Sequence, residues 1–259
     1  MSDESPAVEF PKDQWPRLTA ALADGGMDAA LRILDEPTDP LDRRKLLMFA
    51  TGQLAWQDWP GKNAADYVRA ADWAIAECLA QAETETEDEA RNRRIDLANI
   101  VSYNVSARLA DCWDDDVFER TPERFQKGLD AAVQCLRWRE QLQKGAFPFS
   151  IAWWAEGMHR LSLGEADASV AGFTKSLDYA CQAVRDNDEE PDATVHFGVA
   201  LGEGYLGIAE QHAGLDSGRS RFDAAVAAFE VMATNPDKKG DAEMGLSQLR
   251  TVAQRYPVN

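Results

Sequence analysis

The chain has 259 residues, of which 45% are hydrophobic, and its formal net charge is −18, from 45 acidic and 27 basic residues. Because binding to phosphate groups needs clustered lysine and arginine, this balance argues against nucleic acid and against an anionic membrane surface as partners. The acidity would attract a basic protein or peptide; alternatively, it only keeps the chain in solution or reflects a salt-adapted source.

The amino-terminal residues 1–12 are polar and acidic, and we expect them to form a flexible tail. They lack a basic segment followed by an apolar run, so they do not resemble a secretory signal. No apolar run in the chain approaches the length of a membrane span. The four cysteines, Cys78, Cys112, Cys135 and Cys181, form no CxxC pair, so we expect reduced, packed thiols. These features together predict a cytoplasmic protein.

After the tail, apolar residues recur at three- and four-residue steps along almost the whole chain, which is typical of helices with one apolar face. Glycine and proline interrupt this pattern at short intervals. The pattern predicts eleven helices, near 13–23, 27–35, 40–57, 61–82, 87–111, 121–144, 149–163, 166–187, 192–213, 219–233 and 239–255. The one strand-like run, Thr194–Phe197, has no obvious partner strand. Short breaks between helices favour antiparallel helical hairpins, so we predict an all-α fold.

An internal repeat links the segments 153–178 and 203–233. Each segment has two glycines seven residues apart, Gly157 with Gly164 and Gly207 with Gly214. Each then has a small residue four positions before a phenylalanine, Ser169 with Phe173 and Ala225 with Phe229. A glycine in the first helix lets the second helix approach closely, and the phenylalanine fills the space toward the next hairpin. Since one hairpin cannot bury its apolar face alone, the hairpins are expected to stack.

The residues that carry a family resemblance are Trp153, Gly157, Gly164, Phe173 and Leu177, then Leu206, Gly207, Ala225, Phe229 and, close to its place, Pro236. This arrangement resembles the tetratricopeptide-repeat family. The segment 25–34 looks like a degenerate third copy, whereas 40–144 matches only as helical hairpins. The resemblance implies a right-handed α-solenoid of about five stacked antiparallel hairpins. We therefore predict degenerate hairpins over 13–147, and repeats with a terminal capping helix over 148–259.

In the tetratricopeptide family, the first helices of successive hairpins line a concave groove that takes peptides or helices. By this resemblance, the partner-binding residues are predicted to be Trp154, Met158, Ser162, Ile208, Gln211 and His212. The predicted function is a protein–protein interaction scaffold or adaptor that binds a peptide or helical segment, to which the acidic surface would attract a basic partner. A dedicated inhibitor or immunity-type protein, and a cryptic helical enzyme, remain open as alternatives.

Motifs for chemistry are weak, so we predict no enzymatic activity, no cofactor and no metal. The segment 202–207, GEGYLG, fits GxGxxG but lacks neighbouring parallel strands, and its glycines more simply allow helices to pack closely. The acidic runs at 114–119 and 186–190 lack the order of a calcium loop. The three histidines, His159, His196 and His212, form no metal-binding motif.

Overall fold

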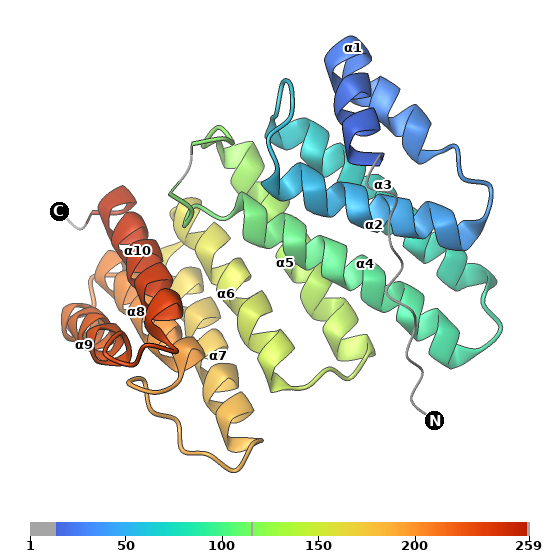
Figure 1. Cartoon of the computed structure of the whole chain (residues 1–259). Coiled ribbons are helices and arrows are strands. Elements are labelled where there is room, and N and C mark those ends of the chain that lie inside the picture. The colour runs from blue at the N-terminus through green and yellow to red at the C-terminus, as the bar shows by residue number, and fades with distance from the viewer. Residues whose placement is uncertain (1–13, 115, 258–259) are drawn as a thin grey trace. The chain divides into compact units, whose positions relative to one another are not determined.

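The computed structural model describes residues 14–114 and 116–257, so the predicted tail 1–12 lies outside the described residues. Within them, every regular element is an α-helix (Figure 1). The helices are α1 (Gln14–Leu34), α2 (Pro40–Trp56), α3 (Ala64–Thr84), α4 (Asp88–Leu109), α5 (Pro122–Gln141), α6 (Ala146–Ser162), α7 (Ala166–Arg185), α8 (Phe197–His212), α9 (Ser217–Met232) and α10 (Lys239–Arg255). The all-α prediction is confirmed for this part of the chain.

Helices α1 and α8 differ from the prediction for local reasons. The predicted helices 13–23 and 27–35 are two arms of α1, which kinks where Gly26 takes a φ of +63°. Helix α8 begins at Phe197 instead of 192, because Asp192 accepts hydrogen bonds from the backbone N–H and the hydroxyl of Thr194 and closes a turn. The strand-like run is therefore a turn that leads into a helix.

Side-chain caps begin several helices. Thr121 Oγ1 accepts a hydrogen bond from Arg124 N at 3.2 Å, and Pro122 occupies the first position of α5. Asp39 caps α2 in the same way, with Leu41 N and Asp42 N as donors. These caps satisfy backbone donors that the first helical turn leaves without partners.

The chain forms two compact units, Met1–Val101 (unit 1) and Ser102–Asn259 (unit 2). In unit 1, α2 packs against α3, and α1 packs on both. Its core includes Leu47 and Ala50 of α2 with Tyr67 and Ala71 of α3. Alanine at several of these positions lets the helices approach closely, and the apolar stripes predicted for this region face one another.

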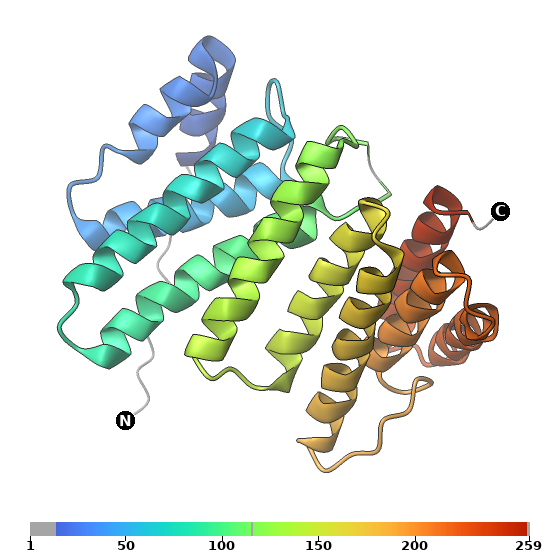
Figure 2. The same ribbon diagram turned by 180° about the vertical axis from the view of Figure 1, so that it is seen from behind.

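In unit 2, each helix from α5 to α9 packs against the next one along the chain, and α10 packs on α8 and α9. Successive helices of this row lie side by side in both views (Figure 1 and Figure 2). Stacked aromatic rings join the hairpins, with Phe173 of α7 on Tyr205 of α8 at a centroid distance of 5.4 Å. The predicted division at 147–148 falls in the first turn of α6, which packs against α5 inside unit 2.

Among the described helices, none combines the length and the apolar character that a bilayer span requires.

Candidate functional site

The six residues predicted to bind a partner lie on α6 and α8 of unit 2, as the repeat alignment requires. Met158 and Ile208 are 0% and 2% exposed and belong to the same buried core cluster as Leu246 and Leu249 of α10. The other four are partly exposed: Trp154, Ser162, Gln211 and His212. Only an edge of this face is exposed, because the chain itself covers its apolar residues.

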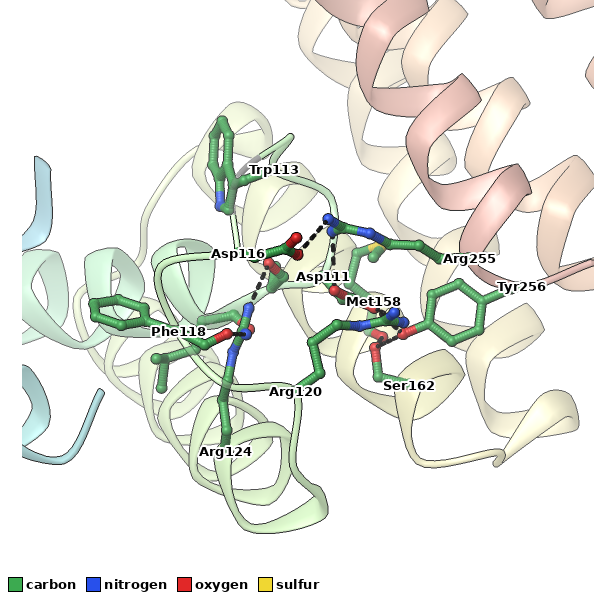
Figure 3. A network of polar contacts seen from close by, with 12 residues as sticks. Asp111, Trp113, Asp116, Phe118, Arg120, Arg124, Met158, Ser162, Arg255 and Tyr256 are labelled. Carbon is green, nitrogen blue, oxygen red and sulfur yellow. Dashed lines mark hydrogen bonds and ion pairs between the residues drawn. The ribbon is translucent and has the colours of Figure 1, made fainter. Parts of the chain in front are cut away.

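The end of α10 contacts two of the predicted residues directly. The hydroxyl oxygen of Tyr256 lies 2.8 Å from Ser162 Oγ, and Ser162 donates to the carbonyl oxygen of Met158 at 2.9 Å (Figure 3). His212 Nε2 lies 2.6 Å from the carbonyl oxygen of Tyr256. Because a carbonyl can only accept, this nitrogen of His212 carries the proton. Residues predicted to contact a partner thus hold the carboxy-terminal segment in place.

The centre of this polar network is Asp111, in the connection between α4 and α5, which is 1% exposed. Its carboxylate accepts from Arg120 Nη2 at 2.5 Å, from Arg255 Nη1 at 3.0 Å and from the Tyr256 hydroxyl at 2.6 Å (Figure 3). We call these four residues, Asp111, Arg120, Arg255 and Tyr256, the Asp111 cluster. Two guanidinium groups and a phenol compensate the cost of burying this carboxylate.

The connection that carries Asp111 is itself fixed by side chains. Trp113 Nε1 donates to the carbonyl oxygen of Ala107 at 2.8 Å. Arg124 Nε donates to the carbonyl oxygen of Leu109 at 3.0 Å, and its Nη1 donates to that of Phe118. The Trp113 bond ties the connection to α4, and the Arg124 bonds tie α5 to Leu109 and Phe118. The carboxylate of Asp111 is thereby held near the end of α10.

Burial sets the protonation of the groups in this network. Burial, together with the hydrogen bond to Asp111, raises the pKa of Tyr256 to about 12, so the phenol stays neutral and can donate. The Asp111 cluster is thus a structural connection between two distant segments. No local pattern in the sequence indicates this connection, because Asp111 and Tyr256 are 145 residues apart.

A second buried carboxyl, Glu156 of α6, pairs with Arg160 one turn later. Burial raises the pKa of Glu156, and the guanidinium of Arg160 opposes this shift. Its Oε2 atom has no hydrogen-bond partner and faces Gly172, where a Cβ would lie 2.3 Å away. The absence of a side chain at Gly172 therefore leaves room for this carboxyl between α6 and α7.

Along α10, unit 2 has a surface hollow of about 380 Å³. It is lined by Asp114, Glu243, Leu246, Ser247, Arg250, Thr251 and Gln254. The lining mixes apolar, polar and charged side chains, with Asp114 and Glu243 providing negative charge. Arg250 provides one positive charge and lies 4.0 Å from Glu230.

The glycines of the GxGxxG segment lie inside α8 and allow close packing. A Cβ on Gly204 would lie 2.4 Å from Leu249 Cδ1, and one on Gly207 would lie 2.7 Å from the backbone nitrogen of Phe222. A phosphate-binding loop needs a strand before it and a helix that starts at the glycines. The segment has neither feature, since it is helical throughout.

No match was found to this chain among protein-family models, curated proteins or solved structures.

The remaining candidates for chemistry are metal-binding side chains and cysteine thiols. Among the described residues, no group of three or more His, Cys, Asp or Glu side chains could hold a metal ion; Asp115 of the first acidic run lies outside them. All four cysteines are free thiols. Burial raises the pKa of Cys78 to about 11 and that of Cys112 to about 12, so both thiols stay protonated and are poor nucleophiles.

Proposed function

We propose that this chain is a protein-binding scaffold whose unit 2 holds a peptide or helical segment of another protein. The observation that carries the proposal is the row of helices α5 to α9, each packed on the next, with α10 against α8 and α9. Rows of stacked hairpins present extended surfaces that suit such segments. The finer expectation of a right-handed, tetratricopeptide-like solenoid is part of this proposal.

The partner surface that we propose joins the exposed side of α10 to the partly exposed predicted residues. Since Met158 and Ile208 are buried, a partner reaches them only if α10 moves. The hollow beside α10 needs no such movement, and its acidic residues Asp114 and Glu243 would attract a basic segment. The net charge of −18 would also attract a basic partner over longer distances.

The experiment begins with capture of partners on the purified chain, followed by measurement of the dissociation constant (Kd) for each captured protein after its purification. The variant Glu243→Lys with Ser247→Arg places two positive charges in the hollow, at exposed positions of α10. We expect the added positive charges to repel a basic partner and to raise the Kd about tenfold or more. A tenfold change in Kd corresponds to only about 1.4 kcal/mol of binding free energy. The matched control is Glu140→Lys, which reverses an exposed charge on α5.

Equal affinities for the wild type, the double variant and the control would remove the hollow from the proposed surface. Failure of every purified candidate to bind would overturn the scaffold proposal itself. Tight one-to-one binding to a single basic enzyme, with loss of that enzyme's activity, would instead identify an inhibitor.

A further inference from the structure

Unit 1 contains a pocket of about 650 Å³, lined by side chains of α2 and of the first part of α4. It is lined by Leu41, Arg44, Lys45, Met48, Phe49, Arg93, Arg94, Asp96 and Leu97. Four of these side chains are cationic and one is acidic. In a chain with a net charge of −18, this local excess of positive charge is unusual and favours an anionic ligand.

The deepest of these cations is Arg44, which is 6% exposed. Its Nη1 donates to Gln81 Oε1, but among the described residues it forms no ion pair with a carboxylate. Burial lowers the pKa of Arg44, and the nearby positive charge of Arg94 lowers it further, while Glu85 and Asp39 oppose these effects less strongly. A buried guanidinium without a paired anion is costly, so an anion entering the pocket would be stabilised beside it.

The second arginine at this end of the pocket also has unused hydrogen-bonding capacity. Arg94 pairs with Glu85 at 2.8 Å, yet its Nε atom is buried and has no hydrogen-bond partner. An anionic oxygen near Arg44 and Arg94 would supply an acceptor for this N–H and a counter-charge for both groups.

The remaining lining consists of four apolar side chains together with Lys45, Arg93 and Asp96. Leu41, Met48 and Phe49 come from α2, where Leu41, Arg44, Lys45 and Met48 share one face through three- and four-residue steps, and Leu97 comes from α4. Leu41 is 44% exposed, which leaves apolar surface uncovered at this position. The pocket therefore combines a guanidinium pair with apolar walls.

We propose that this pocket binds a small amphiphilic anion, a molecule with a carboxylate head group and an apolar body. The carboxylate would lie beside Arg44 and Arg94, and the apolar body would cover Leu41, Met48 and Leu97. A small molecule fits better than a peptide, because about 650 Å³ is within the usual range for small-ligand sites, about 300–1,000 Å³. The inference goes beyond the proposed function, which concerns unit 2, and each can fail without the other.

The test is a calorimetric titration of the full chain with dodecanoate below its micelle-forming concentration. Dodecyltrimethylammonium, with the same apolar chain and a positive head group, is the matched probe. We expect saturable one-to-one binding of dodecanoate and binding of the cation that is weaker by about tenfold or more. Equal binding of the two probes, or no binding of dodecanoate, would overturn the proposal. Binding of a peptide rich in acidic and apolar residues to this pocket, without binding of dodecanoate, would also overturn the proposal.

Substitutions assign the binding to this pocket. Arg44→Gln and Arg94→Gln should each raise the Kd for dodecanoate about tenfold or more. The matched control is Arg43→Gln, which removes the same charge from α2, but from a side chain directed to Asp35 and Glu77. It should leave the Kd within about twofold. If Arg44→Gln fails to fold, the Kd of Arg94→Gln for dodecanoate tests the assignment by itself. An equal change of Kd in Arg94→Gln and Arg43→Gln would overturn the assignment.

Discussion

The imidazole of His159 lies directly against the backbone of Gly128, so that a Cβ added to Gly128 would stand 2.0 Å from His159 Cε1. His159 is fully buried between α5 and α6, and its Nε2 atom lies 2.9 Å from the carbonyl oxygen of Ser106. The glycine of one helix thus makes room for a polar ring of the next. This contact fixes the spacing of α5 and α6 at the start of the helix row in unit 2.

Gly128→Ala should destabilise the protein strongly. The added methyl group cannot fit without displacing the His159 ring or separating the helices, and overpacking of this kind costs about 1–3 kcal/mol or more. For a chain of this size, each kcal/mol lowers the melting temperature by about 2–4 °C. Thermal unfolding followed by circular dichroism measures the change.

The matched control for this substitution is Gly240→Ala, in the first turn of α10, where a Cβ would meet nothing within 4 Å. It should leave the melting temperature unchanged or raise it slightly, because alanine favours a helix over glycine. An equal loss from both substitutions would show that the close contact at Gly128 is not the cause.

Burial of His159 should make stability depend on pH in a defined window. Desolvation lowers the pKa of His159 from its ordinary 6.5 to about 4, so the unfolded chain takes up the proton more readily than the folded one. Stability is therefore full above about pH 6.5 and falls as the pH drops toward 4, by about 3 kcal/mol in total and about 2 kcal/mol by pH 5.

Urea unfolding of the wild type and of His159→Gln at pH 7.5 and pH 5 measures this dependence. Other groups titrate in the same range, so the informative quantity is the pH effect on the wild type minus that on the variant. This difference should be about 2 kcal/mol. An identical pH effect in the two proteins would contradict the assignment of the proton uptake to His159.

The sequence predicted the local features of this fold and missed the distant ones. Apolar spacing placed the helices, and the glycine pattern placed Gly157 where the second helix approaches closely: Ser169 Oγ of α7 donates to the carbonyl oxygen of Gly157 at 3.1 Å. The pattern did not show that α10 would share a core with Met158. A stripe of apolar residues shows which face of a helix is buried, but not which helix packs against it. The sequence also did not predict that the two like charges of Arg44 and Arg94 lie near each other, because these residues are on separate helices.

Asp111→Asn should destabilise unit 2 by about 3 kcal/mol. The substitution removes the charge that compensates Arg255 and Arg120, and breaking a buried ion pair by loss of one partner typically costs about 3–5 kcal/mol, reduced here because Arg120 is partly exposed. Amide hydrogen exchange should accelerate most in the last turn of α10, which the Asp111 cluster holds.

The matched control is Asp116→Asn, which removes the same charge from an exposed side chain that lies 3.5 Å from Arg255. Exposed pairs contribute little, so we expect a change within about 0.5 kcal/mol. Comparable losses from the two substitutions would mean that Asp111 gains nothing from its burial and its three partners.

Gly157→Leu tests the pairing of α6 and α7 on which the repeat alignment depends. The backbones approach so closely that a Cβ on Gly172 would lie 3.0 Å from Gly157 Cα, and Ser169 donates to the carbonyl oxygen of Gly157 at 3.1 Å. A leucine has to force the helices apart, at a cost of about 1–3 kcal/mol or more. Gly52→Leu is the control, because Gly52 lies within α2 facing open space. A lower melting temperature is expected only for Gly157→Leu, and an unchanged one would mean that the hairpin is not packed through this glycine.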